Sequence, residues 1–271
     1  MSSTSAIPAP PEDNSFSPVA YLGQRTLEVF NDTMGILKLF GQTLRFLRQA
    51  EFKHVVEQVY LLGNKSVFFV SIIMGFTGAI MVVQAGKQLE NIVGDLSVVG
   101  PSFLQLIIRE FGPAVAALMI AARYGAAVAA EIGAMQTTEQ IDALRMAGAH
   151  PVPYLVVPRV VGGLIGTIPI AVFASMIAFV IGGISANVIF NVGWDTYFRV
   201  FMVTNADVIV GLTKAAAFGI AVPLVSCFAG LRARGGAPGV GRATTYAVIG
   251  SSVAVLVLDL IVGVWGYLFV G

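Results

Sequence analysis

The stretch Glu131–Gly148, EIGAMQTTEQIDALRMAG, is a short polar segment between two long apolar runs. Thr137 and Gln140 have the spacing of a capping box, in which side chains at a helix start bond its free backbone N–H groups. Gly148 is placed to end the helix, and Pro151 prevents its continuation. A short polar helix is therefore predicted between the two apolar runs.

The apolar runs on either side of this helix belong to a chain that is apolar over most of its length. Of its 271 residues, 56% are hydrophobic and 11% are charged, which excludes an ordinary soluble domain. A helix needs about 20 consecutive apolar residues to cross a bilayer. The sequence predicts an all-α integral membrane protein. Its five transmembrane helices are expected at Ser66–Gln84, Phe103–Ala130, Tyr154–Val188, Val208–Leu231 and Thr245–Val270.

The side chains of the short polar helix suit a contact surface. Glu139 and Asp142 lie in or near its first turn, where the helix dipole favours acidic groups. Ile141 and Leu144 are three residues apart, so they share one helical face. Because an apolar span on each side would hold this helix at the membrane surface, we expect it to press against another protein.

Two segments precede the first predicted span. Residues 1–18 are rich in Ser and Pro and cannot bury a core, so a disordered tail is expected, without the pattern of a cleaved signal peptide. Residues 19–65 carry apolar residues at helical spacing, interleaved with Lys and Arg. This pattern predicts an interfacial amphipathic segment of one or two helices, broken at Gly41 or at Gln49–Lys53. Packing on the chain's own bundle is the alternative. Residues 66–271 form the predicted transmembrane domain.

Lysine and arginine are distributed unevenly about the predicted spans. Six precede the first span, two flank the second connection and three lie in the fourth, whereas the other two connections carry one each. Connections rich in basic residues stay on the cytoplasmic side. The N-terminus and the short polar helix are therefore predicted to be cytoplasmic, and the C-terminus is predicted to lie outside.

Several kinds of site are missing from the sequence. No GxxxxGK[ST] phosphate loop occurs, so no ATP site of the chain's own is recognisable. Cys227 is the single cysteine and can form no internal disulfide. His54 and His150 lie outside the predicted spans, which argues against an intramembrane Ser–His protease, and metal chemistry is equally unsupported. No nucleic-acid partner is expected.

Small residues recur every fourth position along the second predicted span. Such a stripe lets two helices approach closely, either within one bundle or at a seam between two copies of the chain. Both interpretations remain open from the sequence. The stripe consists of Ala117, Ala121, Gly125, Ala129 and Gly133.

Ionisable residues inside the predicted spans are the strongest pointers to function, because charge in hydrocarbon is costly and usually faces a cavity or a partner. Arg109 and Glu110 lie in the outer part of the second span, and Arg123 lies deeper, toward its inner half. Lys214 in the fourth span and Asp259 in the fifth are close enough in depth to form an ion pair. These charges either lock helices together or line a polar route for an amphiphilic cargo.

The run from Arg109 to Val161 carries a family resemblance. It reads REFGPAVAALMIAARYGAAVAAEIGAMQTTEQIDALRMAGAHPVPYLVVPRVV. It closely resembles the permease subunit of MCE-associated ABC lipid transporters, the MlaE/YrbE-like family, in residue identity and spacing. Ala147 is the exception, since the family usually has Met there. In length and span arrangement the resemblance extends from about Tyr21 to the C-terminus.

The resemblance implies a permease domain at 66–271 in a larger assembly. Family permeases form homodimers, bind a cytoplasmic ABC ATPase that holds the ATP and Mg, and meet an MCE-domain lipid-binding protein on the outer side, often with a STAS-domain protein on the ATPase. The short polar helix matches the family's coupling helix, which docks on the ATPase. By that match the coupling residues would be Glu131, Thr138, Glu139, Gln140, Ile141, Asp142 and Leu144.

The function expected from this resemblance is ATP-driven movement of lipid, with phospholipid as the expected class, between the bacterial inner membrane and the outer envelope. The spans support it, because they are mostly Val, Ile, Leu, Phe and Ala, with few polar groups for a hydrophilic solute. An ion-coupled secondary transporter would instead use Glu110, Lys214 and Asp259 for coupling and would need no ATPase. A membrane scaffold for envelope proteins is the third possibility.

Overall fold

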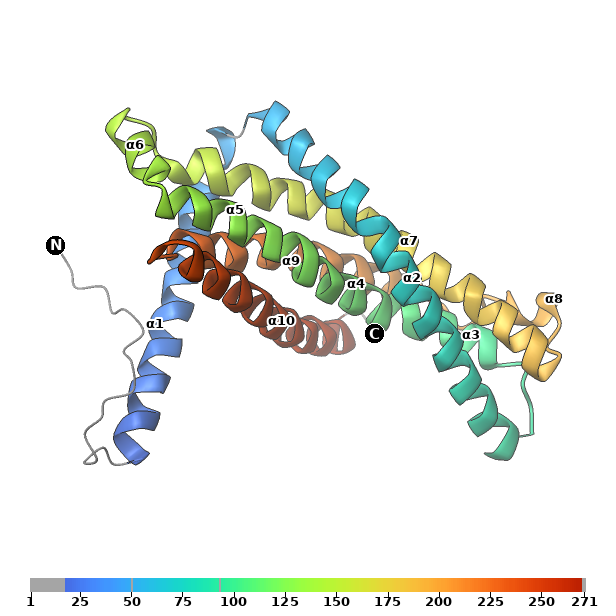
Figure 1. Cartoon of the computed structure of the whole chain (residues 1–271). Coiled ribbons are helices and arrows are strands. Elements are labelled where there is room, and N and C mark those ends of the chain that lie inside the picture. Colours follow the sequence, from blue (N-terminus) through green and yellow to red (C-terminus); the bar gives the residue numbers. More distant parts are fainter. Residues whose placement is uncertain (1–17, 50, 93, 270–271) are drawn as a thin grey trace.

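The computed structural model describes residues 18–49, 51–92 and 94–269, and the regular structure of this part is entirely helical. Five helical stretches are long and apolar enough to cross a membrane, which confirms the predicted fold class. They lie alongside one another as an elongated bundle (Figure 1). The five are α2 (Phe52–Ile92), Val99–Thr137, Val152–Phe190, α9 (Asn205–Leu231) and α10 (Gly236–Phe269).

Two of the five spans contain π-helical turns, which hold one extra residue per turn and occur often at functional sites. The second span runs through α3 (Val99–Leu106), a π-turn at Ile107–Phe111, α4 (Gly112–Ile120), a π-turn at Ala121–Gly125 and α5 (Ala126–Thr137). The third span begins with a π-turn at Val152–Val156 and continues as α7 (Val157–Phe190). The turns therefore fall at the charged positions of the second span and at the start of the third.

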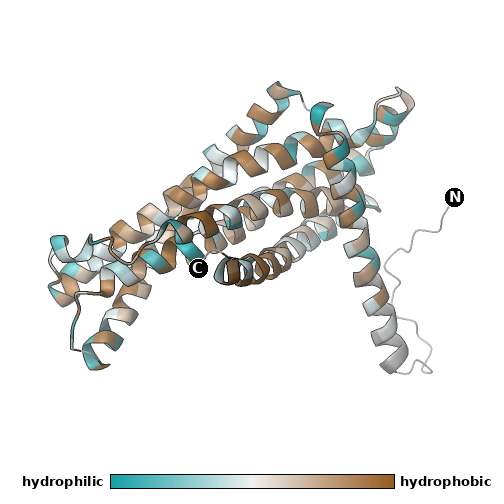
Figure 2. Cartoon of the chain, turned by 180° about the vertical axis from the view of Figure 1, so that it is seen from behind, coloured by the Kyte–Doolittle hydropathy of each residue, from teal (hydrophilic) through white to brown (hydrophobic). Residues whose placement is uncertain are grey.

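The remaining helices lie at the two ends of the bundle. The short helix α6 (Gln140–Met146) is at one end, beside the C-terminal end of α1 (Pro18–Arg45), and α8 (Trp194–Tyr197) is at the other (Figure 1). Figure 2 shows hydrophobic residues along the middle of the long helices and hydrophilic ones gathered at the ends. This distribution is that of a multi-pass membrane protein.

The N-terminal region agrees in part with its prediction. α1 continues through Gly41 and ends at Arg45, and α2 begins at Phe52. The helices are therefore separated near Gln49–Lys53, the second of the two predicted break points. Residues 52–65 are the beginning of α2, so the predicted domain boundary at 65/66 falls inside a continuous helix. The predicted tail, apart from Pro18, lies outside the described residues.

One face of α1 packs against the helical bundle and another face is exposed. Leu39 and Thr43 are buried, and α1 contacts α9 and the π-turn at Val152–Val156. Leu27 and Phe30 are more than half exposed. α1 runs across the direction of the long helices (Figure 1), which suits a helix lying in the membrane interface. The interfacial placement itself stays a prediction.

The small-residue stripe of the second span packs inside this chain. All five of its members are buried. A Cβ atom on Gly125 would lie 2.9 Å from the Oγ of Ser226 on α9, and one on Gly133 would lie 3.3 Å from the Cβ of Ala233 just after α9. Of the two interpretations of this stripe, packing within one bundle is therefore confirmed.

Glycine also determines how closely α2 approaches α7, and this can be tested one turn apart on the same helix. A Cβ on Gly78 would lie 2.2 Å from the carbonyl oxygen of Ala178, whereas one on Gly75 would lie 3.6 Å from the Ile181 side chain. Gly78→Ala is expected to destabilise the folded protein by about 1–3 kcal/mol, the usual cost of overpacking. Gly75→Ala should leave it unchanged or slightly stabilised. Thermal unfolding in detergent measures both, and equal melting temperatures would contradict the close approach.

Candidate functional site

The turn between α5 and α6 differs from the sequence prediction. Thr137 does not cap the short helix, because α5 continues through it and its hydroxyl donates a hydrogen bond to the carbonyl of Ala134 at 3.1 Å. α6 begins at Gln140, and Glu139 precedes it in the left-handed region at φ 61°. Extending α5 satisfies backbone groups that a new cap would have had to serve. The helix itself is present, but it starts later than predicted.

The end of α6 agrees with its prediction. Gly148 has φ +79°, a left-handed value that favours glycine. Its N–H donates to the carbonyl of Arg145 at 3.0 Å, and the N–H of Ala149 donates to that of Leu144 at 3.1 Å. These two bonds form a Schellman motif, which satisfies carbonyls left free at a helix end.

Ile141 was expected on the contact surface of α6, but it faces the bundle. Its side chain is completely buried in its own chain, so it anchors α6 to the bundle and is not available to a partner. Glu139, Gln140 and Asp142 are exposed, and Leu144 is partly buried. The apolar side chain that α6 offers most openly is Met146, which is 84% exposed. Sequence spacing correctly put Ile141 on one face but could not show which way that face points.

Glu131 lies on α5 before the turn, and Thr138 lies in the turn. The carboxylate of Glu131 pairs with the guanidinium of Arg159 on α7 at 2.8 Å. Arg159 is 5% exposed and also donates to the carbonyl of Leu155 at 2.7 Å. The pair therefore ties together the two helices that lead into and out of the α6 segment. The Thr138 hydroxyl donates to the carbonyl of Ala134 at 2.8 Å.

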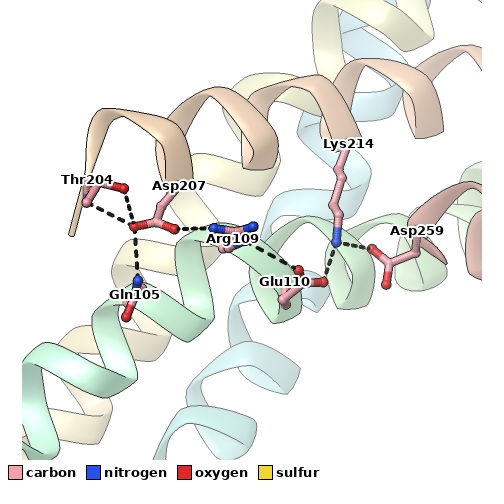
Figure 3. Close-up of polar contacts among 7 residues, drawn as sticks. All are labelled: Gln105, Arg109, Glu110, Thr204, Asp207, Lys214 and Asp259. Carbon is pink, nitrogen blue, oxygen red and sulfur yellow. Dashed lines mark hydrogen bonds and ion pairs between the residues drawn. The ribbon is translucent and has the colours of Figure 1, made fainter. Parts of the chain in front are cut away.

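Four of the five ionisable residues that the sequence placed inside the spans converge in one cluster, shown in Figure 3, whereas Arg123 lies outside it on the π-turn at Ala121–Gly125. Lys214 is fully buried, and its Nζ lies 3.0 Å from an oxygen of Asp259, as the sequence predicted. The same Nζ contacts the carboxylate of Glu110. Lys214 on α9 therefore bridges the second and fifth spans. The carboxylates lie on the more open side, since Glu110 is 35% exposed and Asp259 25%.

A second part of the cluster lies toward the start of α9. Arg109 donates to Asp207 at 3.0 Å, and its Nε is 3.9 Å from Glu110, which links the two parts (Figure 3). Asp207 is fully buried and accepts further bonds from Gln105 at 3.2 Å and from the backbone and hydroxyl of Thr204, both at 2.9 Å. The cluster thus joins three spans through one continuous polar chain.

Sequence comparison identifies the family to which this geometry belongs. The family model described as Permease MlaE matches residues 55–265. This chain belongs to the MlaE permease family. A probable ABC transporter permease protein of Rickettsia felis is 34% identical over 247 residues, which cover 89% of this chain and 94% of the relative.

Other relatives of this MlaE permease come from photosynthetic organisms. A probable ABC transporter permease protein of Synechocystis is 34% identical over 81% of this chain and 84% of its own length. The chloroplastic protein TRIGALACTOSYLDIACYLGLYCEROL 1 of Arabidopsis thaliana is 29% identical over 80% of this chain and 63% of its own length. Residues 55–265, which the family model matches, include most of the observed five-helix bundle.

The backbone brings the charged residues of this MlaE permease together by close helix contacts. A Cβ on Gly211 of α9 would lie 2.2 Å from the carbonyl oxygen of Ile108 in the first π-turn of the second span. A Cβ on Gly263 of α10 would lie 3.4 Å from the Nζ of Lys214. These glycines let α9 and α10 approach the turn that carries Arg109 and Glu110.

An apolar cavity of about 210 Å³ lies beside the cluster, between the second span, α7 and α9. Ser175 contributes the one polar side chain of its lining, and its hydroxyl already donates to the carbonyl of Ala171 at 2.9 Å. The rim includes Met176 and Val172, which are 60% and 45% exposed. The cavity therefore offers hydrocarbon surface and no hydrogen-bonding group for a polar solute.

The described residues contain no group of three or more His, Cys, Asp or Glu side chains that could hold a metal ion. Cys227 is fully buried. The residues that sequence reasoning missed are Asp207, Gln105 and Thr204. Their signal was present, because Thr204 and Asp207 have the spacing of a capping box at the start of α9.

Proposed function

We propose that this chain is the transmembrane permease subunit of an ABC-type lipid transporter, in which a separate ATPase binds ATP and Mg and drives the movement of phospholipid between the inner membrane and the outer envelope. The main support is α6, an exposed polar helix fixed at the end of a permease of the MlaE family. The names of the relatives favour this function over an ion-coupled carrier or a scaffold.

In this proposal α6 is the surface that the cytoplasmic ATPase contacts. Glu139, Gln140 and Asp142 are exposed there for polar contacts, with Leu144 and Met146 as apolar anchors. Closure of the ATPase on ATP binding draws two α6 helices together and collapses a lipid-sized cavity between two copies of the chain; hydrolysis resets it. Because Glu131 pairs with Arg159 at the base of this segment, movement of α6 is passed to both neighbouring spans.

The charge distribution supports an orientation with α6 in the cytoplasm. The basic residues of the α1–α2 junction and of the α9–α10 turn lie on connections at the same end as α6 (Figure 1). By the positive-inside rule this end faces the cytoplasm, so the N-terminus is cytoplasmic and the C-terminus periplasmic in a bacterial inner membrane. An MCE-domain lipid-binding protein then meets the opposite end, and a STAS-domain protein binds the ATPase.

The lipid substrate is supported by the apolar cavity and the exposed faces. A hydrocarbon chain fits a cavity whose walls offer no free polar group, and the partly open charge cluster beside it suits a polar headgroup. α10 is the least buried of the five spans, because only 17% of its most apolar stretch is buried by the rest of the chain. We assign its open face to the second copy of a homodimer.

Copurification tests this proposal. The tagged chain, coproduced with the ABC ATPases and MCE proteins of its source organism, is expected to retain one ATPase and one MCE protein through detergent purification. An unrelated five-span membrane protein with the same tag is the control. Recovery of an intact, folded permease that binds neither a nucleotide hydrolase nor an MCE protein would contradict the proposed assembly.

A further inference from the structure

The carboxylate of Asp32 attaches α1 to both helices of the α9–α10 turn. Asp32 lies in the middle of α1 and accepts a hydrogen bond from the Tyr246 hydroxyl on α10 at 2.8 Å. Its other oxygen pairs with the guanidinium of Arg232, the residue that directly follows α9. Asp32 therefore receives one contact from each side of the turn.

The packing around Asp32 orients these polar contacts. A Cβ on Gly35, one turn further along α1, would lie 2.7 Å from the ring of Phe228 on α9. The guanidinium of Arg232 lies over the same ring, 5.1 Å from its centroid, as in a cation–π contact. Because the glycine lets α1 approach α9 and the ring supports the arginine, the ion pair has less freedom than an ordinary surface pair.

The C-terminal end of α1 meets a different part of the chain. Leu39 and Thr43 are buried, and α1 contacts the π-turn at Val152–Val156, where the third span begins. The ring of Phe46, the residue after α1, lies 5.2 Å from the ring of His150 in the connection between α6 and this span. α1 therefore reaches from the α9–α10 turn to the connection that leads out of α6 (Figure 1).

The two attachments are far apart on one continuous helix. Asp32 and Phe46 are 14 residues apart, which is about 21 Å at a rise of 1.5 Å per residue. α1 is unbroken from Pro18 to Arg45, and α2 begins separately at Phe52. Because a helix fixed at two points moves them together, a displacement at one attachment is carried along α1 to the other.

We infer that Asp32 is a positioning residue that makes α1 a rigid link between the α6 segment and α10. This rests on the proposed function and deepens it. When the ATPase moves α6, α1 carries the displacement to the α9–α10 turn, and so to the face of α10 that we assign to the second copy. Asp32 acts through Arg232 and Tyr246, and not by contact with lipid. Loss of its charge should weaken this link without unfolding the bundle, because a partly exposed ion pair contributes little to stability.

The first test measures the lipid moved per ATP hydrolysed by the reconstituted complex. Asp32→Asn and Arg232→Gln should each lower this ratio about fivefold or more, a typical coupling effect between sites. Each should shift the melting temperature by no more than about 3 °C. The double variant should lose little more than either single one, since both changes break the same pair. Tyr246→Phe should have a milder effect, because it leaves the Arg232 contact in place.

A matched control and three results decide this first test. Asp195→Asn makes the same change at an exposed acid on α8, at the opposite end of the bundle, and should leave the ratio unchanged. A normal ratio in both Asp32→Asn and Arg232→Gln would overturn the inference. So would losses that multiply in the double variant, because the two residues would then act independently. If the wild-type complex hydrolyses ATP and moves no lipid, the proposed function fails instead.

Spin-label distances in the same complex test the rigid link itself. Lys38→Cys on α1 and Arg242→Cys on α10 place the labels at exposed positions, and Cys227 is buried, so it should not compete for the label. With Asp32 present, the distance between the labels should be the same with and without ATP. In Asp32→Asn it should shift or broaden when ATP binds. Equal behaviour of the two proteins, in either direction, would overturn the inference.

Discussion

Lys214→Met is expected to abolish transport and to reduce the amount of folded protein strongly. Lys214 is fully buried between the carboxylates of Glu110 and Asp259. Methionine fits the same space but leaves Asp259 without its cation and Glu110 with only Arg109, at 3.9 Å. Removing one partner of a buried ion pair typically costs about 3–5 kcal/mol, which is a large part of the stability of a domain. Expression level, thermal unfolding and lipid transport measure the effect.

The cluster geometry also predicts an order among the variants. Asp259→Asn should be milder than Lys214→Met, because Lys214 keeps Glu110 as its partner. The double variant should be more stable than Lys214→Met alone, since it removes the unpaired carboxylate of Asp259, and Glu110 retains Arg109 at 3.9 Å. If both single changes leave transport and expression intact, then neither the pairing nor its role in function holds.

Glu139→Lys is expected to uncouple ATP hydrolysis from transport without unfolding the spans. Glu139 is exposed at the start of α6, so reversal of its charge disturbs a partner contact and not the bundle. Transport should fall about tenfold or more, within the range of typical coupling energies between sites. ATPase activity and lipid movement, measured on the same preparation, give the ratio of the two.

Backbone conformation needs its own control at this position, because Glu139 has φ 61°. Asparagine tolerates left-handed backbone better than most residues and is neutral. Glu139→Asn therefore removes the charge without adding strain, and it should weaken coupling less than the reversed charge does. Normal ATPase binding and lipid movement in Glu139→Lys would count against the assigned contact.

The spans were the most predictable part of the fold. All five came from apolar length, which the membrane imposes directly on the sequence. The Lys214–Asp259 pair was predictable from depth alone. Because the rise per residue of a helix is constant, counting residues from the end of each span gives the depth of both side chains in the membrane. Glu110 was recognised as an intramembrane charge, but its contact with Lys214 depends on helix rotation, which depth does not specify.

Rotation and helix junctions explain the remaining errors. Ile141 was placed on the correct helix but was expected to face a partner, whereas its side chain is completely buried in the chain's own core. The start of α6 was misplaced because Thr137, which has capping-box spacing to Gln140, is the last residue of α5 instead. The joining of residues 52–65 to the first span was missed, since that stretch is more polar than the rest of α2. Each of these outcomes was decided by tertiary packing, which overrides local patterns.

Lipid movement by the reconstituted complex tests the central claim most directly. Proteoliposomes that contain the permease, its ATPase and its MCE partner are supplied with a fluorescent phospholipid and, in parallel, with a water-soluble dye. The account predicts that phospholipid moves only while ATP is hydrolysed, that the dye does not move, and that Glu139→Lys lowers lipid movement while hydrolysis continues. Lipid movement that persists without the ATPase and follows an ion gradient would contradict it.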